Sequence, residues 1–540
     1  MHESINRRRG SRLLAAGVLA WAVAIGGIAL PSAFAQSPHP GPQDSRPQAG
    51  EGTHPNGPAA EPGGRPRAQN DRGQNDNAAR LPADSMTDQA IELPGRSLHF
   101  KATAGSIPLN DAESGALQAE VAYVSYVMGS PADNRPVTFL FNGGPGAASA
   151  YLDIGAVGPW RLPLDNVTYS AAPVLAPNAE TWLDFTDLVF IDPVGTGYSR
   201  IATSNENARR SFYSVDGDAN ALAVVIRKWI EKAGRQGAVK FVVGESYGGF
   251  RVPKVARALT SQGVGIRGLV MISPVLDFAT LGNRRHDPMS WVMRLPSMAA
   301  TVLEGSGPFD RERLREVEGY ASGDYLRDLM KGEKDAAAVE RMTPRVAAYT
   351  GLDPAEVRRL AARVDNTTFQ RELNRQRGRV ASAYDPTVTA FDPTPAAATS
   401  RFSDPVLDAM GPPLTAAMTA LYQGTLHWRV EQPYHLLNNE VNGQWNWGRG
   451  RVGPEVVDDL RNALAADRDL NVLVVHGAND LVTPYYASAL VLDQLPVYGS
   501  ADRLKLEVYG GGHMFYSRDA SRRALRDDAR AMYTRALQHE

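Results

Sequence analysis

Short apolar segments alternate with helical patterns along most of this chain, and that alternation limits the folds it can adopt. The apolar runs are rich in Val, Ile, Leu and Phe, and lie at 121–127, 137–141, 188–191, 240–243, 268–272, 472–475 and 504–508. Helical patterns lie between or after several of them, at 221–233, 247–260, 455–466 and 522–537. Strand–helix alternation of this kind favours an α/β fold, in which helices flank a central, mostly parallel sheet on both faces.

The alternation is interrupted between residues 282 and 446. This stretch is rich in Arg, Glu, Ala and Met, shows helical patterns such as 310–318, and contains few strand-like runs. We therefore expect a large, mainly helical insertion, or lid, at 282–446. It would divide the core into a first part at 86–281 and a second part at 447–540.

The N-terminal part is predicted to lie outside the folded core. Arginines precede an apolar run at 13–30, and a small-x-small pattern follows at 33–35, as a signal peptidase requires. Residues 1–35 are therefore predicted to be a signal peptide, and the protein to be exported. Residues 36–80 contain eight Pro and seven Gly but no Val, Ile, Leu, Met or aromatic residue. Such a segment buries too little apolar surface to offset chain entropy, so 36–85 is predicted to be a disordered linker.

The composition excludes several classes of function. The chain has 57 Lys and Arg against 59 Asp and Glu, so it has no basic excess, and no nucleic-acid partner is expected. It has no cysteine, which rules out disulfides, thiolate metal sites and a cysteine nucleophile. An exported chain without disulfides fits the bacterial periplasm or the extracellular space. No apolar run of about 18 residues follows the signal peptide, so no membrane span is expected in the mature chain.

The pattern G-E-S-Y-G at 244–248 supplies the candidate nucleophile. It follows the apolar run 240–243 and precedes the helical pattern 247–260, and this strand–turn–helix setting exposes a catalytic serine. Glycines are needed on both sides because the serine lies on a strained turn, where neighbouring side chains would collide. We therefore predict that Ser246 is the nucleophile.

In this architecture the acid and the base follow the serine along the chain, in the order Ser, Asp or Glu, His. Of the ten histidines, His513 fits best, because its glycine-rich loop directly follows the run 504–508. Asp480 follows the run 472–475 in the same way. Asp480 is predicted to orient His513, which takes the proton of Ser246. The other histidines of the predicted core show no metal-ligand spacing, so neither a metal nor another cofactor is expected.

A second glycine-rich loop, N-G-G-P-G at 142–146, follows the apolar run 137–141. An early loop of this kind supplies one backbone N–H of an oxyanion hole, and the residue after the nucleophile, Tyr247, supplies the other.

These segments resemble the serine carboxypeptidases of peptidase family S10, in a bacterial secreted type. The matching motifs are NGGPG at 142–146, NAETW at 178–182, DPVGTGYS at 192–199, GESYGG at 244–249 and GGHM at 511–514. The resemblance implies an α/β-hydrolase fold. It also implies a serine-type carboxypeptidase that releases C-terminal residues from peptides through an acyl-enzyme intermediate.

The resemblance assigns a role to each site residue. The catalytic triad would be Ser246, Asp480 and His513. The oxyanion hole would be the amides of Gly144 and Tyr247. The groups that hold the free carboxylate of the substrate would be Asn142, Gly143 and Glu245. Glu245 beside a carboxylate is a like-charge pair, so it must be protonated there, which predicts better peptide hydrolysis at acidic pH.

Three departures from the family pattern lie near this site, and the first is Ala147-Ala148-Ser149 after NGGPG, where Cys-Ser-Ser is usual. Ala156 stands where the family commonly has a second glutamate that shares a proton with the one at position 245, and 514–516 reads Met-Phe-Tyr where Val-Pro is usual. The triad itself does not distinguish water from another acyl acceptor. An esterase or acyltransferase therefore stays the main alternative to a peptidase, and a non-catalytic binding protein is a third. The sequence does not predict an oligomeric state.

Overall fold

The structure is a computed structural model that describes residues 80–130, 134–164, 170, 172–282, 284–448 and 453–538. All of these residues belong to one compact unit of the chain. The predicted signal peptide and most of the predicted linker lie outside the described residues.

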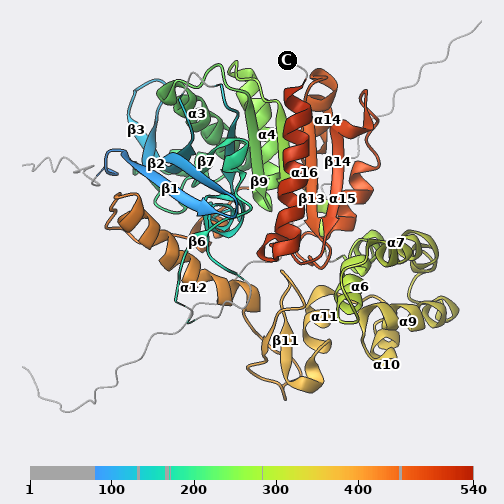
Figure 1. Ribbon diagram of the computed structural model, residues 1–540. Coiled ribbons are helices and arrows are strands. Elements are labelled where there is room, and N and C mark those ends of the chain that lie inside the picture. The colour runs from blue at the N-terminus through green and yellow to red at the C-terminus, as the bar shows by residue number, and fades with distance from the viewer. Residues whose placement is uncertain are drawn as a thin grey trace, which may run out of the picture. The chain divides into compact units, whose positions relative to one another are not determined.

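A ten-stranded mixed sheet forms the centre of the described part (Figure 1). Its strands lie in the order β1-β2-β3-β7-β4-β9-β10-β13-β14, with β8 paired to β3. The strands from β7 to β14 in this order are parallel, whereas β1, β2, β3 and β7 pair antiparallel. The bounds are β1 Ser85–Leu93, β2 Arg96–Asn110, β3 Leu117–Val127, β4 Val137–Phe141, β7 Asp187–Ile191, β8 Arg200–Ile201, β9 Lys240–Glu245, β10 Gly268–Ile272, β13 Asn471–Gly477 and β14 Leu504–Tyr509. A separate pair is formed by β5 Trp160–Arg161 and β6 Ala176–Pro177.

Helices cover both faces of this sheet. Side chains alternate along each strand, so successive residues of one strand reach opposite faces and contact different helices. Phe241 and Val243 of β9 belong to the apolar cluster that contains residues of α16 and of α12 (Pro405–Ala420), whereas Val242 belongs to the cluster that contains residues of α3, α4 and α14. Figure 1 shows α16 running alongside β13. Burial on both faces explains why the inner strands read as continuous apolar runs. The helix bounds in the core are α1 Ala150–Leu152, α2 Glu206–Phe212, α3 Val215–Ala233, α4 Tyr247–Ser261, α14 Val457–Ala466, α15 Tyr485–Leu492 and α16 Asp519–Leu537.

The fold begins earlier in the chain than the sequence predicts. Arg80 forms an ion pair with Glu120 at 2.6 Å, Leu81 is buried, and β1 pairs with β2 at the edge of the sheet. Residues 80–85, predicted as linker, are therefore part of the fold. Every second residue of β1 is exposed, so this strand lacks the continuous apolar run that identifies the inner strands.

Between β10 and β13 the chain leaves the sheet and forms mainly helices. Several of these helices pack around an apolar cluster that includes Trp291, Val346 and Phe369 and that also contains Leu481 and Tyr485 of the core. In Figure 1 the helices α6, α7, α9, α10 and α11 gather beyond one end of the sheet. The bounds are α5 Met289–Val292, α6 Leu295–Glu304, α7 Arg311–Tyr320, α8 Leu326–Leu329, α9 Ala336–Thr350, α10 Pro354–Arg359, α11 Asn366–Glu372, β11 Arg379–Ala381, β12 Thr389–Phe391, α12 Pro405–Ala420 and α13 Asn439–Gly443.

Candidate active site

The loops that carry the predicted site residues leave the sheet at one end. The strands β4, β9, β13 and β14 are parallel and end just before Asn142, Ser246, Ala478 and Gly510. In an open parallel sheet the carboxyl ends of the strands form the edge at which ligands bind. The fold thus gathers the 142–146 loop, the nucleophile turn and the loops of Asp480 and His513 at one edge.

Ser246 occupies a tight turn between β9 and α4. Its φ of 62° and ψ of −125° are rare for a residue with a side chain and persist only where the surroundings enforce them. A Cβ at Gly244 would lie 2.1 Å from the Gly248 oxygen, and one at Gly248 would lie 2.6 Å from the Phe141 oxygen. Side chains are therefore excluded on both sides of the serine. Ser246 itself is half-buried, and its hydroxyl does not cap α4.

Asp480 and His513 form a buried, hydrogen-bonded pair. Asp480 Oδ2 lies 2.7 Å from His513 Nδ1, and the side chains are 0% and 2% exposed. Asp480 Oδ1 accepts from the N–H groups of Val482 at 2.8 Å and Thr483 at 3.0 Å. Burial works to lower the pKa of His513, but the charge and hydrogen bond of Asp480 outweigh it and raise that pKa above its ordinary value. Asp480 can therefore both orient the imidazole ring and stabilise its protonated form.

Thr483 supports this pair, although it was not predicted from the sequence. Its hydroxyl lies 2.6 Å from Asp480 Oδ2, 3.2 Å from His513 Nδ1 and 3.0 Å from the Ser273 carbonyl oxygen. Ser273 in turn donates its hydroxyl to the His513 carbonyl oxygen at 2.8 Å. A threonine three residues after an aspartate is a common turn pattern, so its spacing alone carries no catalytic signal.

The 142–146 loop lies directly against the Ser246 turn. A Cβ at Gly143 would lie only 2.5 Å from the Tyr247 nitrogen, so glycine is required for this approach. Tyr247 is the first residue of α4, and its N–H has no acceptor within the helix. The segment that carries Gly144 and the Tyr247 amide are therefore neighbours, as donation to a single oxyanion requires.

Arg251 anchors this loop from α4 and was also missed at the sequence level. It is 1% exposed, and its Nε lies 2.5 Å from Asp218 Oδ2. Its Nη1 donates to the carbonyl oxygen of Asn142, and its guanidinium lies 4.7 Å from the centre of the Tyr247 ring. Sequence gives no sign that an arginine on a helix is buried, so this role becomes visible only in the structure.

Glu245 is buried between the nucleophile turn and the His513 loop. Its Oε2 accepts from Asn142 Nδ2, whereas its Oε1 lies 3.3 Å from the Tyr516 hydroxyl and 3.9 Å from His513 Nε2. Burial raises the pKa of Glu245 above its ordinary value, against the opposing effects of the His513 charge and the two hydrogen bonds. A perturbed carboxyl group in such a place is a candidate functional group.

The insertion covers His513 directly. The Tyr384 carbonyl oxygen accepts from the His513 N–H at 2.6 Å, and the Tyr384 ring meets the imidazole edge-on at 5.2 Å. Next to it, Asp385 accepts from the Gly512 N–H at 3.2 Å and pairs with Arg518 at 2.7 Å. The segment between β11 and β12 therefore fixes the loop that carries the predicted base.

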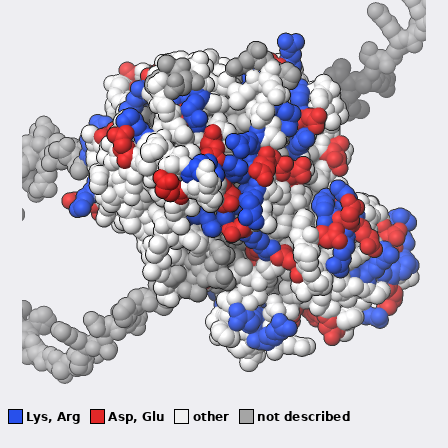
Figure 2. Space-filling model, viewed as in Figure 1, with Lys and Arg blue, Asp and Glu red and all other residues white. Residues whose placement is uncertain are grey.

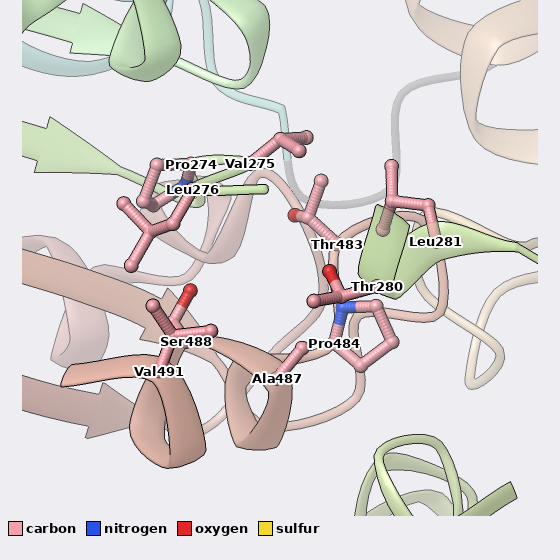
Figure 3. A pocket seen from close by; sticks show the side chains of 10 residues that line it. All are labelled: Pro274, Val275, Leu276, Thr280, Leu281, Thr483, Pro484, Ala487, Ser488 and Val491. Carbon is pink, nitrogen blue, oxygen red and sulfur yellow. The ribbon is translucent and has the colours of Figure 1, made fainter. Parts of the chain in front are cut away.

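Figure 3 shows a pocket between the segment after β10 and helix α15. It is lined by Pro274, Val275, Leu276, Thr280, Leu281, Thr483, Pro484, Ala487, Ser488 and Val491. None of these residues belongs to the predicted triad, but Thr483 lines the pocket and also contacts Asp480 and His513. One of the lining residues, Ser488, contacts His476: the His476 Nε2 lies 2.9 Å from the Ser488 hydroxyl, and burial lowers the pKa of His476 to about 4. A pKa this low keeps His476 neutral near pH 7.

Three broader features concern binding. Within the described ranges, no group of three or more His, Asp or Glu side chains is arranged to hold a metal ion. None of the described helices combines the length and hydropathy that crossing a bilayer requires. On the face drawn in Figure 2, Lys and Arg are interspersed with Asp and Glu.

Comparisons with known proteins show the family to which this chain is similar. A family model described as serine carboxypeptidase matches residues 94–375, more than half of the chain. Serine carboxypeptidase-like 28 of Arabidopsis thaliana is 28% identical over 204 residues, which cover 36% of this chain and 41% of that protein. The pheromone-processing carboxypeptidase KEX1 of Metarhizium robertsii is 31% identical over 187 residues, 33% of this chain and 27% of that protein. The chain thus spans less than half the length of these curated relatives.

Among solved structures, a prohormone-processing carboxypeptidase of Saccharomyces cerevisiae, KEX1(delta)p, superposes with a TM-score of 0.52 at 15% identity. The match covers 79% of this chain and 90% of that one. At this identity the likeness concerns the fold alone. Together with the sheet order, it confirms the predicted α/β-hydrolase fold.

Proposed function

The chain belongs to the serine carboxypeptidase family, and we propose that it is a serine-type carboxypeptidase that removes C-terminal residues from peptides. The relatives named above carry carboxypeptidase names, and their matched parts include only a fraction of each protein. The names of these relatives therefore do not establish the activity of this chain, and the proposal rests on the geometry of the site.

In the proposed mechanism, Ser246 Oγ attacks the carbonyl carbon of the last peptide bond, and His513 Nε2 takes the hydroxyl proton. Asp480 stabilises the resulting imidazolium through its hydrogen bond to Nδ1. His513 then gives the proton to the departing amine, so the C–N bond breaks and an acyl-enzyme forms. A water molecule then attacks the acyl-enzyme in the same way, with His513 as the base, and releases the shortened peptide.

The negative oxygen of each tetrahedral intermediate is assigned to the amides of Gly144 and Tyr247. The contact between Gly143 and Tyr247 supports this assignment, because it keeps the two segments adjacent before substrate arrives. Preorganised donors of this kind stabilise the transition state without further reorganisation.

The observation that carries the exopeptidase assignment is the environment of Glu245. This carboxyl group is buried, next to the nucleophile, and outside the acid–base pair, and burying its charge is costly unless it is paired and hydrogen-bonded. We assign Glu245, Asn142 and Gly143 to the free carboxylate of the substrate. Protonated Glu245 can donate to that carboxylate, whereas ionised Glu245 repels it.

The direct test is to incubate the protein with peptides of defined sequence and to follow the products by mass spectrometry. Stepwise loss of single C-terminal residues is expected, and Ser246→Ala should lose it together with labelling by a serine-directed phosphonate. Removing a triad nucleophile costs about 10⁶ in kcat. Internal cleavage, or turnover of esters alone, would contradict the proposal and favour an endopeptidase, or the esterase or acyltransferase alternative.

We further propose that the enzyme works outside the cytoplasm, in the bacterial periplasm or the extracellular space. The support is the arginine-flanked apolar run and the small-x-small pattern within residues 1–35. N-terminal sequencing of the protein recovered from a bacterial host tests this, and a mature N-terminus just after Ala35 is expected.

A further inference from the structure

The loop that carries His513 continues into a short helical turn, Phe515–Ser517, and this turn brings Tyr516 to Glu245. The Tyr516 hydroxyl donates to Glu245 Oε1 at 3.3 Å. The same oxygen lies 3.9 Å from His513 Nε2, whereas Oε2 is occupied by Asn142. Tyr516 therefore acts on the carboxyl oxygen that faces the predicted base.

Packing holds this phenol in a fixed position. Tyr516 is 0% exposed, and its ring contacts Phe515 with centroids 5.9 Å apart. On another side, a Cβ at Gly155 would lie 3.6 Å from Tyr516 Cε2, beside the fully buried Ala156. Arg522 fixes the main chain by donating to the Tyr516 carbonyl oxygen at 3.0 Å. The hydroxyl is thus presented to Glu245 by a rigid environment.

The titratable groups that act on Glu245 besides Tyr516 come from four segments: His513, Asp480, Tyr151 and Tyr384. Burial raises the pKa of Tyr516 well above its ordinary value, and the charge of Glu245 adds to this effect. Tyr516 therefore stays a neutral donor over the working range of an enzyme. A neutral donor stabilises ionised Glu245 through a hydrogen bond and does not transfer its proton to the carboxylate.

We propose that Tyr516 is a positioning residue that sets specificity: its hydroxyl holds Glu245 and limits the pH range over which a terminal carboxylate is recognised. The inference rests on the proposed function of Glu245. Glu245 and His513 titrate as a pair, and the productive state has Glu245 protonated and His513 neutral. The Tyr516 hydrogen bond favours the opposite distribution, with Glu245 ionised beside protonated His513. It therefore lowers the pH above which carboxylate recognition is lost.

The test uses Tyr516→Phe, which keeps the ring and removes the hydroxyl. For the variant and the wild-type protein, kcat/KM is measured from about pH 4 to about pH 8 on a blocked dipeptide and on its C-terminal amide. For the free acid, the alkaline limb should move up by about one pH unit in the variant. For the amide the alkaline limb should stay in place, because its hydrolysis does not need protonated Glu245.

Two further variants separate this effect from a general loss of structure. Tyr123→Phe on β3 also removes a phenol from a carboxylate, Asp84 at 2.6 Å, and should leave the free-acid profile at its wild-type position. In a Glu245→Gln background the side chain no longer ionises, so adding Tyr516→Phe should not move the limb.

The outcomes also separate this inference from the function on which it rests. If the wild-type protein prefers the free acid and Tyr516→Phe leaves its alkaline limb in place, the role of Tyr516 is wrong and the carboxypeptidase assignment stands. An equal shift on acid and amide would also overturn the role, because Tyr516 would then act through His513. If the wild-type protein does not distinguish acid from amide, the proposed role of Glu245 and this inference fall together.

Discussion

Asp480 Oδ2 lies 2.7 Å from His513 Nδ1, and neither side chain is more than 2% exposed. With its proton held on Nδ1 by this carboxylate, the neutral imidazole presents Nε2 as an acceptor. Nε2 faces the nucleophile turn, where it lies 3.9 Å from Glu245 Oε1. The pair and the carboxyl group next to Ser246 therefore form one connected unit, and each of its members can be tested separately.

Asp480→Asn tests the pair itself. The amide keeps the shape of the carboxylate but removes its charge and favours the wrong tautomer of His513, so kcat should fall by about 10⁴. Turnover of an activated ester measures this without dependence on Glu245. Asp502→Asn, which changes an exposed aspartate near β14, serves as the control and should keep wild-type kcat. A kcat within a few fold of the wild-type value in Asp480→Asn would exclude Asp480 as the acid.

Thr483 should act through Asp480, because its hydroxyl lies 2.6 Å from Oδ2. Thr483→Val removes that hydroxyl at nearly constant volume, and a lost hydrogen bond to a charged group should lower kcat roughly 10-fold, with little change in KM. Thr483→Ser keeps the hydroxyl and should restore most of the rate. If the serine variant is as slow as the valine variant, packing rather than the hydrogen bond is responsible.

Asp192 gives a prediction on stability. It is buried after β7 and accepts from the Ser149 N–H at 2.8 Å, and burial raises the pKa of Asp192 to about 7. A carboxyl group with a raised folded-state pKa stabilises the fold most below its unfolded value of about 4, and this contribution is lost as pH rises towards 7. Asp192→Asn removes this titration.

Between about pH 4 and pH 7, Asp192→Asn should therefore gain stability relative to the wild-type protein, by a few kcal/mol in the free energy of unfolding. Urea denaturation at a series of pH values measures the difference. Arg341 lowers the pKa of Asp328 to about 2, so Asp328 changes stability with pH in the opposite sense to Asp192. Its contribution is the same in the wild-type protein and in the variant, and therefore cancels in their difference. A difference that does not vary with pH would mean that Asp192 does not titrate in this range.

The parts of the fold that the sequence predicts are those with a simple burial pattern. The inner strands β9, β10 and β13 are covered on both faces, so each is a short apolar run, and the residues after such runs point to the site. The hairpin of β1 and β2 could not be found in this way, because β1 is exposed on alternate residues. Its start near Arg80 depends on Glu120, which is distant in the sequence.

The residues of the candidate site also fall into those that local patterns predict and those that depend on distant contacts. Ser246, Asp480 and His513 follow strands directly, so local patterns predict their positions. Arg251 and Tyr516 depend on contacts between distant segments, with Asn142 and Glu245 respectively, and a single sequence shows neither. The position of Tyr384 over His513 likewise depends on how the insertion packs, which its helical pattern does not specify.

The central claim is that the enzyme recognises the free carboxylate at the end of a peptide. The most direct measurement is kcat/KM for a blocked dipeptide and for its C-terminal amide, at about pH 5. One charge-assisted hydrogen bond contributes roughly 1.5–3 kcal/mol, so the free acid should be cleaved about 10- to 100-fold more efficiently. Equal efficiency on the two substrates, at this pH and up to about pH 8, would contradict the claim and indicate an esterase or endopeptidase on a carboxypeptidase fold.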